Sequence, residues 1–506
     1  MNLFPSEATL LPLRGRQPQA IEGIKQAIRE GHKRIMLQLP TGGGKTVLSS
    51  HLITGALAKG NRVMFCVPRL SLIDQTVERF VQNGIRDIGV IQGQHRLTNP
   101  YACVQVASIQ TLVRREIPDV TFIILDEAHI QRKEINALLQ SEEWKDKIVI
   151  GLSATPWSKG LGLIWTRLII GATTRDMIEE GWLSPLRGFS VPDEFMPDTS
   201  KIHTNFDGDY VEGEAEKEMS KDVIVGNVVD TWLKHRDLGN HPGDRTFMFC
   251  VNRTHAQKMQ QAFEKKGIPC GYIDGTMDAD EREEVFKRYR AREIKIISSI
   301  DTIGIGVDED VRCIVYTRLT RSEMKWVQDI GRGLRLADGK LSVLLLDHAG
   351  TCEELGDPTY IHHDRLDTRS PKEKGAAYQE DVPPPKPRKC PKCSYLISAG
   401  ALVCPECGTL LAKKSKTPRE VQGELVEIGK KPKKANMDDK QKFYSELLGY
   451  AMQYGKSEKW VLANYRQKFG VWPRSMQEIP LRPSTKFRTE MRDKFNQWKK
   501  EKEGVA

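Results

Sequence analysis

The sequence at residues 39–46 reads Leu-Pro-Thr-Gly-Gly-Gly-Lys-Thr, a glycine-rich run that ends in Lys-Thr. A predicted strand precedes it and a predicted helix follows it, so the glycines lie in the turn between them. Such a turn points backbone N–H groups at phosphate oxygens, and the helix adds its positive N-terminus. Lys45 then pairs with the β- and γ-phosphates, and the Thr46 hydroxyl holds Mg²⁺. The predicted nucleotide-binding residues of this loop are Thr41, Gly42, Gly43, Gly44, Lys45 and Thr46.

A second stretch, at residues 122–129, supplies the acids that a nucleotide site needs. It reads Phe-Ile-Ile-Leu-Asp-Glu-Ala-His, in which an apolar strand delivers two adjacent carboxylates at its C-terminal end. Parallel α/β sheets bind their ligands at that end of the strands. We expect Asp126 to share the Mg²⁺ with Thr46, and Glu127 to orient or deprotonate the attacking water.

Outward from these two stretches, short apolar runs alternate with helical patterns from residue 16 to residue 350. This alternation predicts parallel sheets with crossover helices, and its repetition predicts two α/β domains in tandem. A segment rich in Asp, Asn and Gly at residues 193–243 interrupts the pattern and is interpreted as an insertion or a mobile loop. The predicted strands cover residues 34–39, 62–67, 122–125 and 148–152 in the first domain, and 246–251, 294–298, 313–316 and 343–346 in the second.

The glycine loop, the DEAH sequence at residues 126–129 and the Ser-Ala-Thr sequence at residues 153–155 occur in the order of motifs I, II and III of superfamily 2 helicases. The chain resembles that family. The resemblance implies two RecA-like domains that close on ATP. It also implies that Gln17 reads the adenine edge, and that Ser153 and Thr155 couple hydrolysis to movement between the domains.

The second half of the chain resembles the later motifs of the family. Residues 328–335 resemble motif VI, which implies that Gln328 senses the γ-phosphate or the water. Arg332 and Arg335, three residues apart, are expected on one face of a helix. The resemblance makes both reach across the cleft to the γ-phosphate, with Arg335 as the arginine finger.

Motif V is matched less closely, at residues 298–310. Ile305 stands where relatives carry a polar residue, so only Gly306 and Asp308 are carried over to the nucleotide site. Residues 67–69, 106–112 and 249–253 resemble motifs Ia, Ib and IV, which contact the nucleic-acid backbone. The contacts that this resemblance implies are Arg69, Ser108, Asn252 and Arg253.

Four of the ten cysteines form a pattern that is typical of a metal site. Two Cys-x-x-Cys pairs are separated by ten residues, and four thiolates in a tetrahedral array select Zn²⁺. Because no position is left open, the metal is predicted to be structural. Disulfides are the alternative, and an intracellular chain disfavours them. The predicted ligands are Cys390, Cys393, Cys404 and Cys407.

Positive charge is concentrated after the last predicted strand. Residues 366–506 contain 30 lysines and arginines against 17 acidic residues, whereas residues 1–365 contain 47 against 50. A basic appendage is typical of a contact with an anionic polymer, although a solvated surface is an equal alternative. The last block carries many aromatic residues, which either stack bases or form the core of a small helical domain.

These observations predict six segments along the chain. Residues 1–185 and 186–365 are the two RecA-like domains, and the rest are a proline-rich linker at 366–389, a zinc ribbon at 390–412, a basic linker at 413–437 and a basic aromatic helical domain at 438–506. The motor followed by a zinc ribbon resembles the RadD-like bacterial DNA-repair helicases and related helicases of bacteriophages.

The expected function is that of an ATP-dependent helicase or translocase that uses ATP, Mg²⁺ and structural Zn²⁺ and acts on branched or single-stranded DNA. Two alternatives stay open: an RNA helicase, and an ATP-switched clamp that recruits partners without unwinding. A single-strand-binding, repair or replication protein is the candidate partner of the tail. The sequence has no run of about 18 apolar residues that could span a bilayer and no signal-peptide pattern. We therefore expect no membrane contact and a cytoplasmic location, in a bacterial cell or a phage-infected host.

Overall fold

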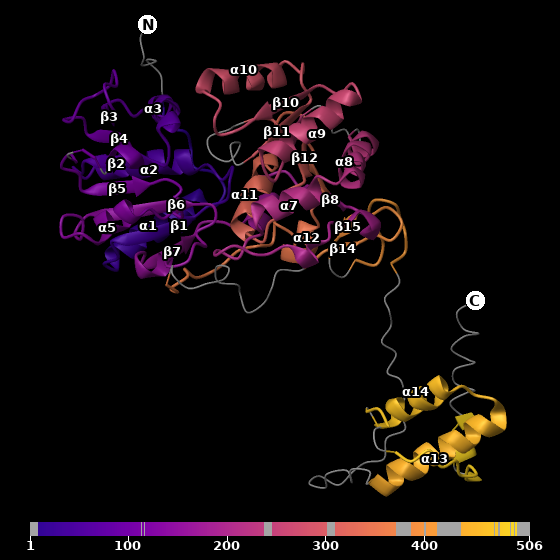
Figure 1. Cartoon of the computed structure of the whole chain (residues 1–506). Coiled ribbons are helices and arrows are strands. Elements are labelled where there is room, and N and C mark those ends of the chain that lie inside the picture. Colours follow the sequence, from indigo (N-terminus) through magenta and orange to yellow (C-terminus); the bar gives the residue numbers. More distant parts are fainter. Residues whose placement is uncertain are drawn as a thin grey trace. The chain divides into compact units, whose positions relative to one another are not determined.

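Two parallel β-sheets organise the chain in the computed structural model (Figure 1). Each sheet is built from consecutive strands joined by helices, which confirms the prediction of two tandem α/β domains. The structure describes residues 9–112, 114–115, 117–236, 245–300, 309–370, 386–398, 401–411, 437–469, 471–473, 476–485, 487–489 and 491–492.

The first sheet has seven strands in the order β3-β4-β2-β5-β6-β1-β7, all parallel. Most of its strand residues are buried, because helices cover both faces. The strands are β1 (Arg34–Gln38), β2 (Val63–Val67), β3 (Ile88–Ile91), β4 (Val104–Ser108), β5 (Phe122–Leu125), β6 (Ile148–Ser153) and β7 (Arg167–Ile170). The helices are α1 (Gln17–Arg29), α2 (Lys45–Leu57), α3 (Ile73–Gln82), α4 (Ile109–Leu112), α5 (Lys133–Gln140) and α6 (Thr174–Glu179), with short 3₁₀ turns at Leu70–Leu72 and Leu161–Leu163.

The strand order of the first sheet brings the predicted motifs to one edge. Strand β6 lies between β5 and β1, so Ser153 at its end falls between the acidic pair and the glycine loop. The register pairs Gln38 with Ser153 and Leu125 with Gly151. The carboxyl ends of three neighbouring strands therefore form one site.

The second sheet has six parallel strands in the order β10-β11-β9-β12-β13-β8. Its strands are β8 (Leu186–Ser190), β9 (Thr246–Phe249), β10 (Cys270–Ile273), β11 (Ile296–Ser299), β12 (Cys313–Tyr316) and β13 (Val343–Asp347). Its helices are α7 (Glu212–Met219), α8 (Asp222–His235), α9 (Arg253–Lys265), α10 (Ala279–Arg290), α11 (Glu323–Gly333) and α12 (Thr351–Leu355), with 3₁₀ turns at Asp193–Phe195 and Thr199–Lys201.

Helices make up much of the described part of the segment that interrupts the sequence pattern. Residues 193–236 contain two 3₁₀ turns followed by helices α7 and α8, so within them the expectation of a mobile loop was wrong, whereas the alternative of an insertion stays a prediction. Helix α8 buries Val228, Val229 and Trp232, whose spacing of one, three and four residues is helical. Apolar spacing in this segment was masked by the polar residues that surround it.

Four further elements are described after the second sheet and its helices. Strands β14 (Arg388–Lys389) and β15 (Leu396–Ile397) form an antiparallel pair that carries the cysteines. Residues 1–414 form one compact unit and residues 415–506 another. The second unit holds helices α13 (Met437–Tyr454) and α14 (Glu458–Phe469), which confirms a helical C-terminal region.

Candidate active site

The loop at residues 39–46 joins β1 to α2 and has a backbone that requires glycine. Gly42 and Gly44 have φ angles of 82° and 79°, a left-handed conformation that disfavours residues with a Cβ. At Gly43 a Cβ would lie 2.7 Å from Cγ of Leu39. Gly44 caps α2, so the first turn of that helix brings Lys45 and Thr46 to the wall of a cavity.

Gln17, predicted to read adenine, lies behind this loop. Its side-chain amide donates to the backbone oxygen of Gly43 at 2.8 Å and to that of Gly44 at 3.3 Å. Its Oε1 accepts from the backbone N–H of Arg14 at 3.0 Å. Gln17 is 3% exposed, so in this state its amide donors hold the loop in place. The adenine role stays a prediction.

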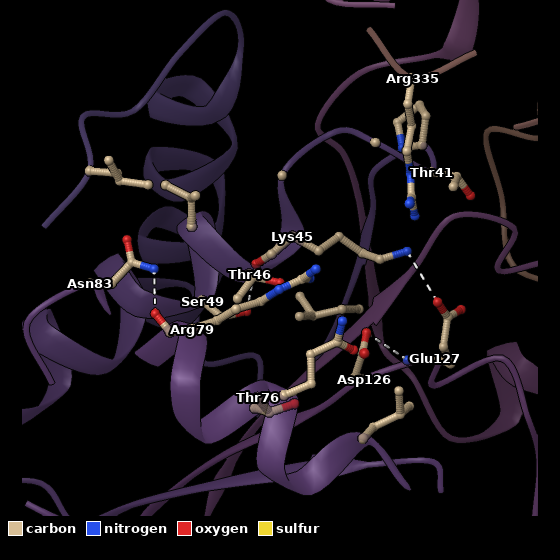
Figure 2. Close-up of a pocket in the computed structure, with 18 of the residues that line it drawn as sticks. Thr41, Lys45, Thr46, Ser49, Thr76, Arg79, Asn83, Asp126, Glu127 and Arg335 are labelled. Carbon is tan, nitrogen blue, oxygen red and sulfur yellow. Dashed lines mark hydrogen bonds and ion pairs between the residues drawn. The ribbon is translucent and has the colours of Figure 1, made fainter. Parts of the chain in front are cut away.

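The two acids follow β5 directly and face the same cavity (Figure 2). Adjacent residues of a strand point to opposite faces, and here the chain turns instead. Glu127 adopts a φ of 49°, which is strained for a residue with a Cβ. Asp126 accepts the backbone N–H of Glu127 at 3.0 Å, and Lys45 Nζ lies 3.4 Å from Oε1 of Glu127.

The environment gives the two carboxyls different proton affinities. Burial, together with the negative charge of Glu127, raises the pKa of Asp126 above its usual range. Burial is the largest single influence on Glu127 and favours its neutral form, but the nearby positive groups, Lys45 first among them and Arg332 also, together outweigh it and lower the pKa of this carboxyl. Glu127 is therefore the more acidic of the two carboxyls and is charged near neutral pH, as a residue that accepts a proton from water must be.

Gln328 of α11 reaches across from the second domain into the first. Its amide nitrogen donates to Oγ1 of Thr155 at 2.7 Å and lies 3.2 Å from Nε2 of His129. Nδ1 of His129 lies 2.9 Å from Oγ of Ser153, whose oxygen also accepts the backbone N–H of Thr155 at 3.0 Å. The DEAH sequence, residues 153–155 and Gln328 thus form one polar network.

This network fixes the tautomer of His129. Because the amide nitrogen of Gln328 is a donor, Nε2 of His129 accepts and Nδ1 carries the proton. Burial lowers the pKa of His129, which keeps the ring neutral. The neutral ring can then donate toward Ser153 while it accepts from the other domain.

Arg332 and Arg335 both line the cavity, although they do not share one helix. Helix α11 ends at Gly333, so Arg332 lies in its last turn and Arg335 lies beyond it. The expectation of one helical face was therefore wrong, because the helix stops between them. Arg335 still approaches the loop: a Cβ on Gly42 would lie 3.2 Å from its Cγ.

The cavity has a volume of about 480 Å³ and extends beyond the predicted residues (Figure 2). Arg14 and Trp182 line it, with the Arg14 guanidinium 5.4 Å from the Trp182 ring centroid. Gln75, Thr76 and Arg79 of α3 line it as well. Sequence reasoning missed these three, although Ile73, Val77, Phe80 and Val81 form the buried face of the same helix and their helical spacing leaves Gln75, Thr76 and Arg79 off that face.

The predicted nucleic-acid contacts lie on both domains and differ in accessibility. Ser108 ends β4, is fully buried and has its Oγ 2.9 Å from Oγ1 of Thr111. Asn252 caps α9 by accepting the backbone N–H of His255 at 3.0 Å. Arg253 is half-exposed with Nε 3.2 Å from Asp274 Oδ2, and Arg69 is partly exposed. Gly306 and Asp308 lie outside the described residues.

Comparison with known proteins identifies the family to which a chain with this nucleotide-binding cavity belongs. Residues 10–158 match the family model "Type III restriction enzyme, res subunit", and residues 228–337 match "Helicase conserved C-terminal domain". The chain is a superfamily 2 helicase. The prediction of an ATP-hydrolysing enzyme is thereby confirmed.

Two relatives and one solved structure illustrate how far the similarity extends. The helicase is 27% identical to the "51.5 kDa protein" of a Lactococcus phage (isolate 7-9), over 86% of this chain and 89% of the phage protein. It is 28% identical to a Saccharomyces cerevisiae protein that carries the name ATP-dependent helicase IRC3, over 67% of this chain but about half (51%) of the yeast protein. A fragment of an HsdR subunit of a type I restriction enzyme from Vibrio vulnificus YJ016 shares the fold, with a TM-score of 0.52 at 20% identity over 69% of this chain and 67% of that one.

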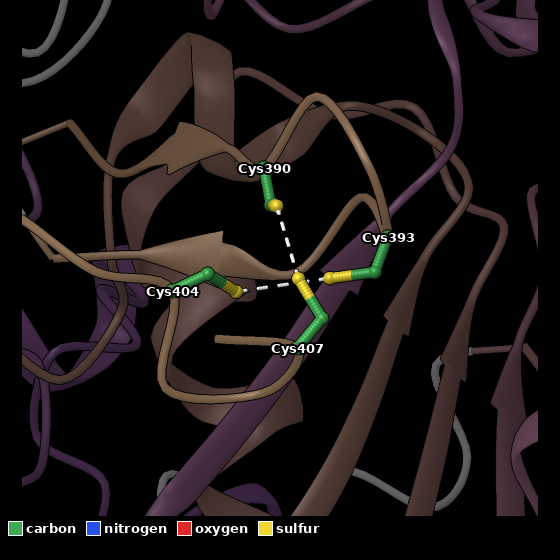
Figure 3. Close-up of side chains that lie close together, drawn as sticks. All are labelled: Cys390, Cys393, Cys404 and Cys407. Carbon is green, nitrogen blue, oxygen red and sulfur yellow. Dashed lines mark hydrogen bonds between the residues drawn. The ribbon is translucent and has the colours of Figure 1, made fainter. Parts of the chain in front are cut away.

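The helicase carries its four predicted metal ligands in one cluster (Figure 3). The Sγ atoms of Cys390, Cys393, Cys404 and Cys407 all lie within 4.8 Å of one another. Two of the separations are 3.6 and 3.7 Å. Tetrahedral zinc with Zn–S bonds of about 2.3 Å places its sulfurs roughly 3.8 Å apart, so the cluster fits this ion.

The ribbon of the helicase packs on β8, the strand at one edge of the second sheet. The backbone N–H of Ser190 donates to the oxygen of Ser394 at 3.1 Å, and Phe189 pairs with Tyr395 in a single antiparallel bridge. Arg187 forms an ion pair with Glu406, with Nε at 3.0 Å from Oε2. The ribbon is thus attached to the second domain by backbone, ionic and aromatic contacts.

The helical unit of the helicase uses part of its aromatic content as a core. Phe443, Tyr444 and Tyr465 are at most 6% exposed, whereas Tyr454 and Trp472 are 49% and 46% exposed. The first three form the small core that the sequence left as one alternative, and the last two stay available on the surface. Among the described residues, none of the helices is both long and apolar enough to cross a bilayer.

Proposed function

We propose that this helicase is a DNA-stimulated ATPase that translocates on, or unwinds, branched or single-stranded DNA. The observation that carries the proposal is the contact network across the cleft. Gln328 touches Thr155 and His129 of the first domain, while Arg332 and Arg335 line the cavity that holds Lys45 and the acidic pair. A site assembled from two domains hydrolyses nucleotide only when they are closed, and this links hydrolysis to motion.

The residues present fit ATP and Mg²⁺. Glycines at the loop leave backbone space that a Cβ would fill, and Lys45 and Thr46 lie beside them at the cavity wall. Lys45 would hold the phosphates, and Thr46 and Asp126 would hold the metal. Bound Mg²⁺ supplies positive charge that neutralises the phosphate oxygens.

The protein's own groups then have separate tasks in hydrolysis. Glu127, kept charged by Lys45, accepts a proton from the attacking water or orients it. Arg332 and Arg335 stabilise the negative charge that develops on the transferred phosphoryl group. Gln328 couples closure of the two domains to residues 153–155 at the end of β6, because its side chain donates a hydrogen bond to Thr155.

DNA is proposed as the polymer because the matching family model is named for a restriction enzyme. RNA is the alternative, since groups that grip a sugar-phosphate backbone do not by themselves separate the two. We propose further that the cysteine cluster binds structural Zn²⁺ and that the basic tail contacts nucleic acid or a repair or replication protein. A phage relative matched over most of its length supports action in the cytoplasm of a bacterial cell or a phage-infected host.

The test measures ATP hydrolysis with single-stranded, duplex, forked and junction DNA and with matched RNA. We expect stimulation by DNA, and a loss of at least about 100-fold in kcat for Glu127→Gln and for Lys45→Ala. Lys59→Ala serves as the matched control and should retain activity, because Lys59 is exposed and lies just beyond the C-terminal end of α2.

Two outcomes would contradict parts of this proposal. Stimulation by RNA alone would replace DNA with RNA as the substrate. If either active-site variant kept its hydrolysis rate, the nucleotide site would be misplaced.

A further inference from the structure

We infer that residues 357–370 form a strap that runs from the second domain back onto the first, and that His363 within it is a positioning residue for helix α11. Only the kinetic test of this inference, the ATPase assay below, depends on the proposed function. The strap follows α12, where the backbone N–H of Cys352 donates to Asp347 at the end of β13, and precedes the ribbon, which packs on β8. The contacts of the strap with the first domain therefore lie between two described segments that contact the second sheet.

The strap is attached to the first domain at several points. The backbone N–H of Gly162 donates to the oxygen of Asp367 at 2.9 Å, and Leu366 packs among the buried residues around β5 and β6. A Cβ on Gly162 would lie 2.7 Å from Cγ2 of Thr368, so the two segments are in close contact. The Arg175 guanidinium lies 4.9 Å from the ring centroid of Tyr360.

His363 is the point at which the strap touches both domains. Its ring meets that of Trp157 edge to face, with centroids 4.8 Å apart and planes at 64°. Its Nε2 lies 2.8 Å from Oε2 of Glu323, the first residue of α11. His363 and Trp157 are each 4% exposed, so water does not compete for these contacts.

These contacts belong to a closed series of contacts that includes Thr155, one of the two predicted coupling residues. Trp157 donates its backbone N–H to the oxygen of Thr155 at 2.8 Å, and Thr155 accepts from Gln328 at 2.7 Å. Gln328 lies five residues after Glu323 on the same helix, and Glu323 returns to His363. His363 therefore fixes the start of α11 against the same segment that Gln328 touches further along the helix.

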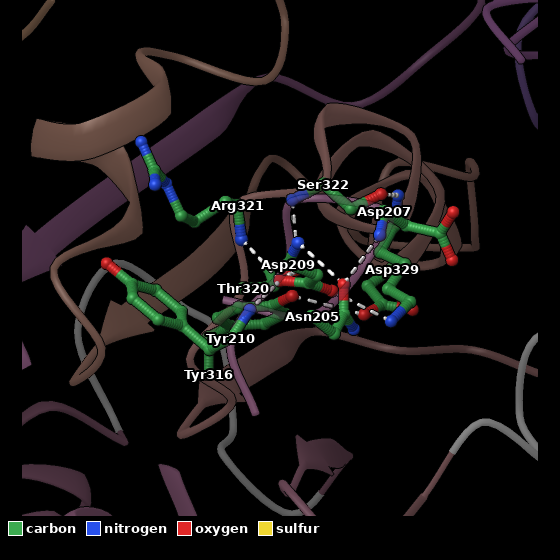
Figure 4. A network of polar contacts seen from close by, with 10 residues as sticks. Asn205, Asp207, Asp209, Tyr210, Tyr316, Thr320, Arg321, Ser322 and Asp329 are labelled. Atoms are coloured by element: carbon green, nitrogen blue, oxygen red, sulfur yellow. Dashed lines mark hydrogen bonds and ion pairs between the residues drawn. The ribbon is translucent and has the colours of Figure 1, made fainter. Parts of the chain in front are cut away.

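The start of α11 is also held by a contact network within the second domain (Figure 4). Asp209 accepts from Oγ1 of Thr320 at 3.0 Å, from the backbone N–H of Arg321 at 2.7 Å and from Nζ of Lys325 at 2.9 Å. A carboxylate near a helix N-terminus is favourable for the helix dipole. Asp209 stabilises α11 through contacts within its own domain. Of Asp209 and His363, His363 is the one that connects α11 to the first domain, because it contacts both Glu323 and Trp157.

The first readout needs no catalysis. Hydrogen–deuterium exchange is measured on the full-length protein without nucleotide, for wild type, His363→Ala and the control His362→Ala, an exposed neighbour on the same strap. We expect His363→Ala to speed exchange at residues 323–328 and 155–163 by about 10-fold or more, because a buried hydrogen bond to a charged group is lost. Strands β9 and β12 should keep their rates, and unchanged rates at residues 323–328 overturn the inference.

The second readout separates positioning from a general loss of stability. In the nucleic-acid-stimulated ATPase assay, His363→Ala should lower kcat by about 10-fold with less than about threefold change in KM for ATP. His363→Gln, which keeps a donor near Glu323, should recover part of the loss. A kcat equal to that of wild type overturns the positioning role. An inactive wild type with the expected exchange changes would instead contradict the proposed function and leave the strap supported.

Discussion

Glu127 illustrates what a single backbone angle does for this site. With ordinary strand geometry, Asp126 and Glu127 would point to opposite faces of the sheet. The φ of 49° at Glu127 lets both line one cavity, and such a conformation costs on the order of 1–3 kcal/mol. The two acids and their tasks were predicted from the sequence, but no residue pattern indicates that Glu127 adopts a left-handed backbone conformation. Its placement depends on packing around β5.

Gly44 provides a test at the scale of one residue. A Cβ there would lie 2.4 Å from the amide nitrogen of Gln17, which holds the loop through Gly43. We expect Gly44→Ala to displace that amide and to lower kcat/KM for ATP by about 100-fold, in addition to a strain of about 1–2 kcal/mol. ATPase kinetics and thermal unfolding measure the two effects.

Gly60→Ala is the matched control for this substitution. Gly60 has a similar φ of 75°, but a Cβ there would meet no atom within 4 Å. It should show the strain and keep the activity. If Gly44→Ala behaved in the same way as Gly60→Ala, Gln17 would have no part in holding the loop.

Secondary-structure elements were predictable where apolar runs were long and buried. The strands at residues 122–125 and 313–316 have the predicted bounds, and residues 34–39 and 343–346 differ from β1 and β13 by one residue. Strands β3, β4, β7, β8 and β10 were not predicted. The sequences of β7 and β8 contain Arg167, Arg187 and Gly188, and β7 keeps partly exposed side chains, so neither reads as a continuous apolar run.

The end of α11 could not be read from the spacing of its arginines. Arg332 and Arg335 fit a helical face, yet the helix stops at Gly333, which its neighbours crowd. A Cβ on Gly333 would lie 2.7 Å from Ile314 and 2.8 Å from Val343, so close packing on β12 and β13 fixes this position. Such tertiary contacts are not visible in a local sequence pattern.

The ribbon provides a test at the scale of an element. Removing zinc with a chelator, or Cys404→Ser, should unfold the ribbon, because structural zinc supplies much of the folding free energy of such small units. The contacts on β8 would then be lost. We expect the melting temperature of the second domain to fall by about 4–8 °C, on the basis of roughly 2 kcal/mol of docking contacts. Scanning calorimetry and exchange at residues 186–190 report the change.

Cys103→Ser is the matched control for the ribbon variant, since Cys103 is an exposed cysteine outside the cluster. It should leave melting and metal content unchanged. A protein that contains no zinc, or whose β8 exchange ignores the metal, would contradict the structural role.

At the scale of the whole molecule, the chain divides into a motor with its ribbon and a separate helical unit. Residues 412–506 carry 23 lysines and arginines against 12 acidic residues. Deleting them should leave basal ATP hydrolysis intact, because every described residue of the cavity lies in the first unit. Binding to single-stranded DNA at low salt should weaken by about 10-fold or more, with a shallower salt dependence. Fluorescence anisotropy across a salt series measures both.

A shorter deletion, of residues 437–506 alone, separates the helical unit from the basic linker that precedes it. If this deletion reproduces the full effect, the helical unit carries the binding. If the complete deletion binds DNA as tightly as the full chain, the tail has another task. A tail-free motor that still separates strands would exclude the clamp alternative.

The docking of the ribbon on β8 has a consequence for the fate of the protein in a cell that lacks zinc. A parallel sheet ends in a strand with unpaired backbone groups, and such an edge can recruit a strand from another molecule. In this chain the backbone N–H of Ser190 is already taken by Ser394, and Leu396 lies over Gly188, where a Cβ would meet it at 2.9 Å. Loss of the proposed zinc ion would uncover that edge while the rest of the motor stays folded. Zinc starvation should therefore produce aggregates of motors that are otherwise intact, built edge to edge through β8.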